Sequence, residues 1–167
     1  FPIFFKQYWH SGTDPIISTA HLGLANAIAG LCVACLAPFL GTMADISASK
    51  KWFLIRFMCL GALTTLALGF IGPGQWQWAM GAFVLATVGF MCANVFYDAM
   101  LADVAPLALR HQTSSLGYAL GYLGGGLLLL IQLCMIQFPE WFRLDTSVMA
   151  VKVSFIMTGI WWVLFSI

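Results

Sequence analysis

The stretch from Trp76 to Leu101, WQWAMGAFVLATVGFMCANVFYDAML, decides the fold class of this chain. A helix that crosses the hydrocarbon core of a bilayer needs about 20 mostly apolar residues, and this stretch exceeds that length with Asp98 as its single charged residue. A strand of a membrane barrel would be about ten residues long and would alternate apolar with polar side chains. The stretch therefore predicts a membrane-spanning α-helix, because only helices and closed barrels satisfy their backbone polar groups in lipid.

Similar apolar stretches lie on both sides of it. The predicted spans are residues 18–44, 52–71, 76–101, 115–138 and 148–167, and residues 1–9 have the composition of the end of an earlier span. Short polar turns separate the spans. We therefore expect an all-α membrane protein in which residues 1–167 form one transmembrane unit, a six-helix bundle with a truncated first helix.

The composition of the whole chain agrees with membrane insertion. Hydrophobic residues make up 62% of the chain and charged residues 8%, whereas a water-soluble domain has about 25% charged residues. Lipid must therefore solvate much of the surface. The net charge of +1 and the absence of a basic stripe argue against a nucleic-acid partner, so the expected partners are the bilayer and a small-molecule solute.

Catalytic and metal-binding patterns are missing from the sequence. It contains no P-loop, no H-E-x-x-H and no G-x-S-x-G motif. The three histidines, His10, His21 and His111, fall at different depths of the predicted spans, so we expect no convergent acid–base or metal site. The chain is predicted to be neither an enzyme nor the holder of a cofactor or metal.

A polar turn between the second and third predicted spans carries the first candidate functional group. Gly41 permits close approach of two helix backbones, and Asp45 is placed to cap the next helix and meet its positive dipole end. Lys50 and Lys51 can anchor the turn at the lipid headgroups. The alternative interpretation of these residues is an ordinary cytoplasmic turn.

A second candidate is a glycine-rich face in the stretch 115–138. Gly117, Gly121 and Gly125 recur every four residues, so they form one groove on a helix, where a partner helix can pack closely. Gly124 and Gly126 add to the glycine content, which also suits a hinge that bends during alternating access. Close packing is the simpler interpretation, and the hinge is the functional one.

Polar residues inside the spans are costly unless they line a cavity or find a partner. Asn94 and Asp98 lie four residues apart, hence on one helix face, with Tyr97 beside them. They are candidates for the wall of a solute pathway. Alternatively, Asp98 forms a gate pair with Arg110 or lies near Asp45.

Two further polar residues lie deeper in the predicted spans. Asn26 belongs to the second span and Gln132 to the fifth. We regard both as lesser candidates for the pathway, because a hydrogen bond between helices is the more frequent role of such a residue.

The segment from Gly41 to Lys51 resembles the loop motif between the second and third helices of the major facilitator superfamily. Its Gly, its Asp and its two terminal Lys match in order and spacing, whereas Ile46 and Ala48 stand where the family usually has a basic residue and a glycine. The resemblance implies that Asp45 helps to hold a cytoplasmic gate closed.

Four segments spread over the chain are similar to the vacuolar amino-acid effluxer-like branch of that superfamily. They are residues 1–9, 95–99, 121–126 and 161–165. The glycine pattern also partly resembles a fifth-helix motif of antiporters and exporters, with Tyr122 in place of its proline. The resemblance implies a twelve-helix protein of which this chain is the N-terminal half, so that the C-terminal half of the same protein is a partner.

These observations together predict a secondary active transporter that works by alternating access. The expected solute is a small polar molecule such as an amino acid, and export is favoured over import. The expected location is a bacterial cell membrane, or the vacuolar membrane in a fungus. Two alternatives are a sugar–cation symporter of the same fold, which would place paired carboxylates inside the second and fourth spans, and a structural membrane subunit that transports nothing.

Overall fold

The computed structural model describes residues 1–46 and 49–166, and all regular secondary structure in these ranges is helical. The elements are α1 (Pro2–Phe4), the π-helical turn η1 (Phe5–Trp9), α2 (Pro15–Ile46), α3 (Lys50–Leu68), α4 (Trp76–Val104), the 3₁₀ turn η2 (Leu107–Leu109), α5 (Arg110–Gln137), the 3₁₀ turn η3 (Pro139–Phe142) and α6 (Ser147–Ser166). Ser47, Ala48 and Ile167, which belong to the predicted second turn and sixth span, lie outside the described residues.

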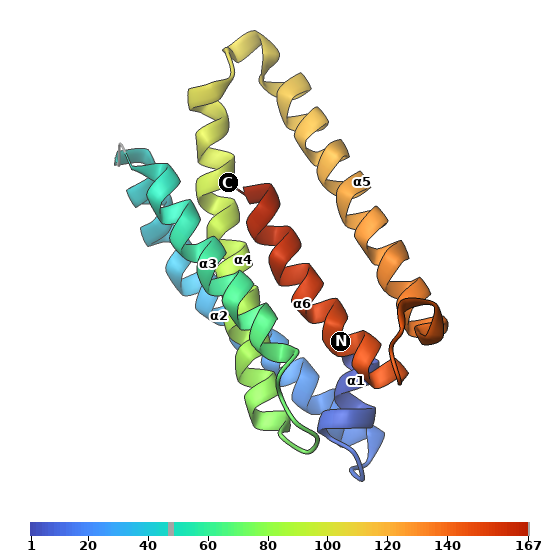
Figure 1. Ribbon diagram of the computed structural model, residues 1–167. Helices are drawn as coiled ribbons and strands as arrows, with labels where there is room; N and C mark the ends of the chain where they lie inside the picture. Colours follow the sequence, from blue (N-terminus) through green and yellow to red (C-terminus); the bar gives the residue numbers. More distant parts are fainter. Residues whose placement is uncertain (47–48, 167) are drawn as a thin grey trace.

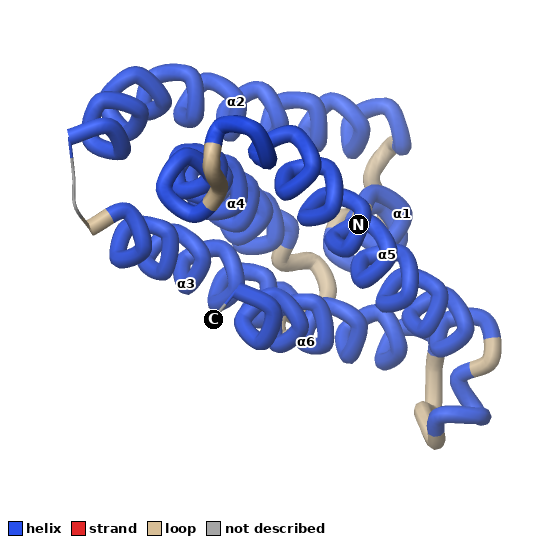
Figure 2. The backbone as a smooth tube through the Cα atoms, turned by 90° about the horizontal axis from the view of Figure 1, so that it is seen from above, coloured by secondary structure: helices blue, strands red, loops and turns tan. Residues whose placement is uncertain are grey.

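The five long helices α2 to α6 are each long and apolar enough to cross a membrane. Helices α2, α3, α4 and α6 form a packed group, and α5 stands beside it (Figure 1). Helix α5 is joined to α4 through η2 at one end and to α6 through η3 at the other. Viewed along the bundle, α5 and α2 lie on one side of α4, and α3 and α6 on the other (Figure 2).

Several helices are longer than the spans expected from the apolar runs. Helix α2 begins at Pro15, where the backbone N–H of Ile16 donates to Asp14 Oδ1 at 2.8 Å and so satisfies one of the free N–H groups of a helix start. Its other end includes Asp45. Asp45 therefore does not cap the next helix, and that interpretation is wrong, because the residue still belongs to the last turn of α2.

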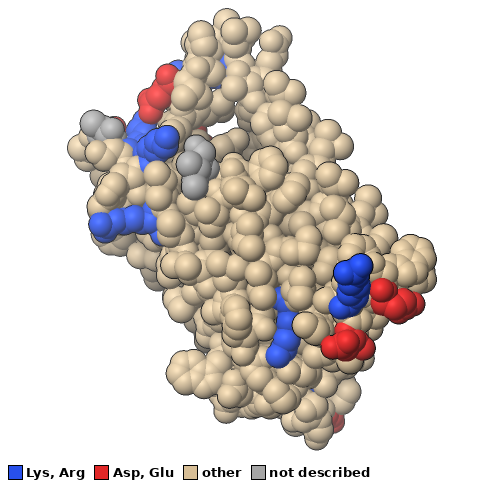
Figure 3. Space-filling model, in the orientation of Figure 1, with Lys and Arg blue, Asp and Glu red and all other residues tan. Residues whose placement is uncertain are grey.

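The surface of the bundle is largely apolar. Large side chains such as Leu63 and Phe90 are exposed on the long helices, as expected where lipid is the solvent. On the face shown in Figure 3, charged side chains gather toward the two ends of the bundle and leave uncharged surface between them. This distribution keeps charges near the headgroups, where they cost least.

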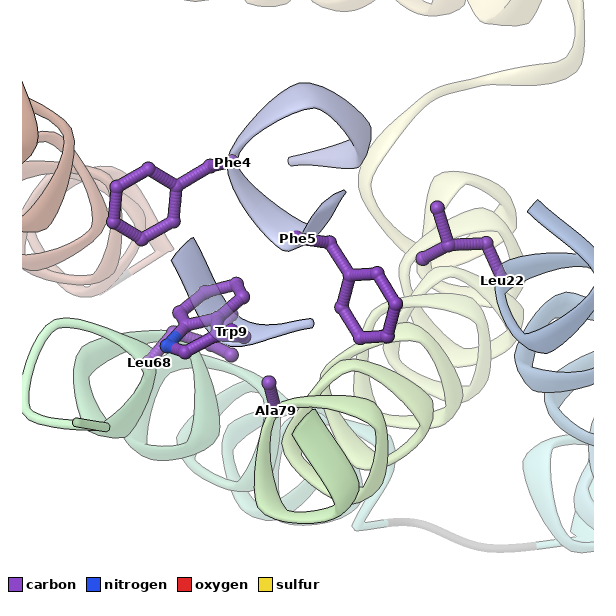
Figure 4. Packing of buried hydrophobic residues seen from close by; sticks show 6 residues of the cluster. All are labelled: Phe4, Phe5, Trp9, Leu22, Leu68 and Ala79. Atoms are coloured by element: carbon purple, nitrogen blue, oxygen red, sulfur yellow. The ribbon is translucent and has the colours of Figure 1, made fainter. Parts of the chain in front are cut away.

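A cluster of aromatic and aliphatic side chains fixes α1 and η1 to the bundle. Figure 4 shows Phe5 and Trp9 beside the labelled residues of α2, α3 and α4, while Phe4 points toward α6. The buried members of the cluster are Phe4, Phe5, Trp9, Leu22, Leu68 and Ala79. Trp9 Nε1 also donates to the carbonyl of Ile71 at 3.3 Å, so the side chain is both packed and hydrogen-bonded.

Glycines bring α3, α4 and α6 into close contact. A Cβ atom built on Gly89 of α4 would lie 2.6 Å from the backbone nitrogen of Gly61 in α3. A Cβ atom on Gly159 of α6 would lie 2.5 Å from Cγ of Leu66 in α3. At these points the absence of a side chain is what allows the helices to approach.

The glycine face of α5 is in a different situation. Built Cβ atoms on Gly121, Gly125 and Gly126 meet nothing within 4 Å in the described chain, and the one on Gly124 meets only Trp161, at 3.9 Å. Gly117 is the exception, because its Cβ would lie 3.0 Å from Tyr97 Oη. The close helix packing predicted for this face is therefore not formed by residues 1–46 and 49–166, which place α5 against α6 through other residues. The hinge interpretation stays a prediction.

Candidate functional site

A cavity of about 400 Å³ lies between α3, α4, α5 and α6, at the end of the bundle where α4 finishes and α5 begins. Its polar wall consists of Lys51, Tyr97, Asp98, Thr113, Ser114, Tyr118 and Ser166. Its apolar wall consists of Leu54, Met100, Leu101, Val104 and Phe165. The cavity thus combines one ammonium group, one carboxylate and several hydroxyl groups with an aliphatic and aromatic surface.

Asp98 is the central acidic group of this cavity. The hydroxyl of Tyr118 on α5 donates to Asp98 Oδ1 on α4 at 3.3 Å, and Tyr97 reaches the α5 backbone near Gly117. The sequence placed Asp98 and Tyr97 among the pathway candidates. Nothing in the pattern pointed to Tyr118, because the contact depends on how α5 is rotated against α4.

Asn94 lies one helical turn before Asp98 on α4. It is half-buried and does not line the cavity. Its side chain makes no hydrogen bond to any residue in the described ranges, in contrast to that of Asp98. The predicted trio of Asn94, Tyr97 and Asp98 is therefore divided, and two of its members reach the cavity.

Arg110 serves the end of α4 and does not pair with Asp98. Its Nε donates to the carbonyl of Ala105 at 3.2 Å, and its Nη2 donates to that of Ala102 at the same distance. The last carbonyls of a helix lack intrahelical partners and carry the negative end of the dipole, which favours a guanidinium there. The predicted gate pair of Asp98 and Arg110 is absent from this arrangement.

The ion pair found at this end is formed by Lys50 and Asp103. Lys50 Nζ lies 2.8 Å from Asp103 Oδ2 and 3.1 Å from Oδ1, and it donates to the carbonyl of Ala99 at 3.4 Å. These contacts join the start of α3 to the end of α4. The predicted fourth span ended at residue 101, which put Asp103 in the following turn. Helix α4 continues to Val104, and Asp103 on its last turn can therefore pair with Lys50.

The four residues of the predicted gating motif do not form one cluster. Lys50 forms the ion pair with Asp103, and Lys51 lines the cavity. Asp45 is exposed on α2 and has no ion-pair or hydrogen-bond partner in the described ranges, and a Cβ on Gly41 would meet nothing within 4 Å there. Within the described chain, Gly41 and Asp45 therefore face open space.

The two lesser candidates differ from each other. Asn26 Nδ2 donates to the carbonyl of Leu22 at 2.9 Å, one turn earlier in its own helix, so the predicted hydrogen bond between helices is wrong for Asn26. Gln132 Nε2 donates to the carbonyl of Ser154 at 3.1 Å and to Thr158 Oγ1 at 2.9 Å. Gln132 therefore ties α5 to α6 and is not free to contact a solute.

The histidines are not all at different depths, which corrects the expectation from the sequence. The ring centroids of His10 and His21 lie 5.1 Å apart, because the turn after η1 returns the chain beside the start of α2. His111 is exposed in the first turn of α5. Among the described residues, no group of three or more His, Cys, Asp or Glu side chains could hold a metal ion.

One family model and two curated proteins match this chain. The family model described as vacuole effluxer Atg22 like matches residues 12–105 and 102–167. A protein of Bacillus subtilis (strain 168) described as an uncharacterized MFS-type transporter, YxiO, is 37% identical over 169 residues, which cover the whole of this chain and 40% of the relative. An uncharacterized protein of Aquifex aeolicus (strain VF5) is 28% identical over 131 residues, which cover 75% of this chain and 34% of the relative.

The chain matches only part of the length of each relative. The chain spans about 40% of the length of the Bacillus protein and less of the Aquifex protein. No solved structure matches the chain significantly. The activity of the whole protein is therefore inferred from the arrangement described above together with the family.

Proposed function

This chain belongs to the vacuole effluxer Atg22-like family within the major facilitator superfamily, and we propose that it forms the N-terminal half of a secondary active transporter. Its five long apolar helices make it part of a multi-pass integral membrane protein. In this proposal, the cavity between α3, α4, α5 and α6 is a section of the solute pathway that opens by alternating access.

The observation that carries the proposal is the pair of opposite charges that line one cavity inside an apolar bundle. Asp98 and Lys51 both belong to the cavity wall, although an ionisable side chain in a membrane helix is costly unless it lines a water-filled space or finds a partner. Asp98 has only the neutral hydroxyl of Tyr118 as its hydrogen-bond donor in the described chain. A carboxylate with a single neutral donor retains the capacity to bind a cationic group.

The solute that fits this wall is a small zwitterion. An α-ammonium group would bind to Asp98, and an α-carboxylate would bind to Lys51 with help from the hydroxyls of Thr113 and Ser114. The apolar wall, which includes Leu101 and Phe165, would contact an aliphatic or aromatic side chain. We therefore favour amino acids as the solute class, and the effluxer-like family favours export as the direction.

The gate in this proposal lies at the same end of the bundle. The ion pair of Lys50 and Asp103 holds α3 to α4, while Asp45 and Gly41 on α2 face away from the described residues. We infer that Asp45 contacts the C-terminal half of the protein when the cytoplasmic side is closed. The glycine-rich stretch of α5 (Gly117, Gly121, Gly124, Gly125 and Gly126), which has open space at Gly121, Gly125 and Gly126, would serve as the hinge.

Transport by the full-length protein in liposomes tests the proposal. Uptake and counterflow would be measured for a panel of radiolabelled amino acids, with sugars as a second panel. Asp98→Asn and Lys51→Met should each reduce amino-acid flux at least tenfold, because a lost charge–charge contact of about 1.4 kcal/mol corresponds to that factor. Asp145→Asn and Lys6→Met remove the same charges outside the cavity and should leave flux unchanged.

Three outcomes would contradict the proposal. Flux of sugars in place of amino acids would favour the symporter alternative, and absence of any flux would favour a structural subunit. Full amino-acid flux in Asp98→Asn would leave transport intact but remove the cavity from the pathway.

A further inference from the structure

Three aromatic rings from three segments meet at the end of the bundle opposite the cavity. His10 lies in the turn after η1, His21 lies in the second turn of α2, and Trp76 is the first residue of α4. Trp76 stacks on His21 with ring centroids 4.7 Å apart and an interplanar angle of 12°. It also contacts His10, with centroids 4.9 Å apart, so one indole covers both imidazoles.

His10 has little access to water or to compensating charge, and one ring nitrogen of the half-buried His21 is also buried. His10 is only 6% exposed, and its Nδ1 lies 2.9 Å from Ser18 Oγ, which is also buried. The Nδ1 atom of His21 is buried without a hydrogen-bond partner in the described chain. The ring of His21, 5.1 Å from that of His10 between centroids, offers no negative charge to stabilise a proton on His10.

The segments around the pair carry one carboxylate, that of the exposed Asp14, and it makes no hydrogen bond or ion pair with either imidazole in the described chain. Their other titratable side chains are Lys6, Tyr8, Asp14 and Lys152. Asp14 Oδ1 accepts the N–H of Ile16, and Lys152 lies over the ring of Tyr8, 5.1 Å from its centroid. The α3–α4 turn and the first turn of α4 contain no acidic residue.

We propose that His10, His21 and Trp76 form a pH-sensitive clasp that holds the start of α2 to the start of α4 while the imidazole of His10 is neutral and loosens when His10 takes up a proton. About 30 Å of α4 separates Trp76 from Asp98, at 1.5 Å per residue, so the clasp acts at the other end of the bundle from the cavity. Protons on that side of the membrane would therefore change the bundle without entering the cavity. The clasp does not depend on the identity of the solute.

The direction of the pH effect follows from the environment of His10. Burial, and secondarily the nearby His21, lower the pKa of His10 below its ordinary value of 6.5. A histidine with a lowered pKa binds fewer protons when folded than when unfolded, so its site gains stability as pH rises. The clasp is therefore fully formed above about pH 6.5 and loses stability as pH falls below that value.

The test uses the full-length protein in lipid nanodiscs between about pH 8 and about pH 5. Thermal unfolding gives the overall stability, and hydrogen exchange of residues 8–21 and 71–79, corrected for the intrinsic effect of pH, gives the local opening. In the wild type, both segments should exchange faster and the melting temperature should fall at acid pH. His10→Gln removes the imidazole of His10 and can still hydrogen-bond Ser18, so it should flatten both pH profiles.

His111→Phe is the matched control, because it removes an exposed histidine at the other end of the bundle and should leave both profiles unchanged. His10→Asn is the second variant, which also replaces the imidazole with a neutral amide, and it should flatten the profiles if His10→Gln does not fold. A wild-type pH profile in both folded variants would overturn the proposal. So would uptake of the His10 proton above pH 6.5 in ¹⁵N-histidine spectra, where the resonance is identified by its loss in His10→Gln.

Discussion

The glycines of α3, α4 and α6 and the glycines of α5 have opposite surroundings. At Gly89, an added Cβ atom would lie 2.6 Å from Gly61 N and 2.9 Å from the carbonyl oxygen of Phe57, so two helix backbones are in direct contact. At Gly121 and Gly125, an added Cβ would meet nothing within 4 Å in the described chain. Yet it is α5 that has the regular four-residue spacing of a packing motif.

The difference shows that glycine spacing alone does not identify a tight helix contact. Gly61 is the single glycine of α3, and Gly89 lies eight residues after Gly81 in α4, so neither belongs to a four-residue repeat. Both are buried, because Gly89 packs against the backbone of Gly61 and Gly61 also packs against Trp162 of α6. In α5, Gly121 and Gly125 lie on one face with no partner among the described residues, whereas Gly117 meets Tyr97 of α4. An open face of this kind suits a contact that forms and breaks, whereas the contact between α3 and α4 suits a permanent one.

The largest effect is expected from Gly89→Ala. The new methyl group would overlap backbone atoms of α3, which cannot move aside as a flexible side chain can, and overpacking of this kind costs about 1–3 kcal/mol. Unfolding of the full-length protein in mixed micelles of increasing SDS content measures the change. Gly81→Ala is the control on the same helix, because its Cβ would meet nothing within 4 Å. Equal stability of the two variants would contradict the permanent contact.

A smaller effect is expected from Gln132→Leu, which removes the hydrogen bonds that tie α5 to α6. Hydrogen bonds between membrane helices contribute about 0.6 kcal/mol on average and about 1.7 kcal/mol at most. Gln112→Leu, at an exposed position in the first turn of α5, is the control. A double-mutant cycle with Thr158→Val measures the coupling, and zero coupling would mean that α5 is held by other contacts.

The ion pair between α3 and α4 is expected to contribute less. The Lys50 side chain is 17% exposed and that of Asp103 is 56% exposed, and pairs that are this accessible contribute about 0.2–1 kcal/mol. A cycle of Lys50→Met and Asp103→Asn should give a coupling of that size, which decreases with added salt. The neighbouring Lys51→Met should not couple to Asp103→Asn. Salt-independent coupling at Lys50 would show that the pair is more buried in the intact protein.

The smallest loss, or a slight gain, is expected from Gly121→Ala. Alanine in place of a helical glycine that has open space around it stabilises by about 0.4–1 kcal/mol. The same SDS titration checks this in the full-length protein. A loss as large as that of Gly89→Ala would show that residues outside this chain pack permanently on the glycine face. Reduced transport with unchanged stability in Gly121→Ala would support a hinge at the glycines of α5.

Part of the candidate site could be predicted from the sequence. Asp98 and Tyr97 stood out because they are polar residues within an apolar run. Helix periodicity put Asn94, one turn before Asp98, on the same face, yet Asn94 does not line the cavity. Tyr118 and Lys51, which do line the cavity, could not be derived in this way. Contacts between helices depend on the rotation and crossing of each helix, and many side chains have to be packed at once before either is determined.

The structure assigns other residues a different role from the one predicted from the sequence. Arg110 became a cap for the carbonyls of α4, and Lys50 found Asp103 in place of a partner near Asp45. His10 and His21, which the linear order of spans put at different levels, met through the turn after η1. In each case the partner lies on another helix or across a turn, where residue spacing carries no information.

The sequence by itself determined that this chain spans a membrane as α-helices. Its long apolar runs have few charges, and in lipid a helix is how such a run satisfies the hydrogen bonds of its backbone N–H and C=O groups. Its motifs also indicated the family, which the comparisons show. Only the tertiary structure decided which glycines touch, which charges pair and which histidines meet. Those contacts arise between side chains far apart in the chain, and they exist only when several helices pack together.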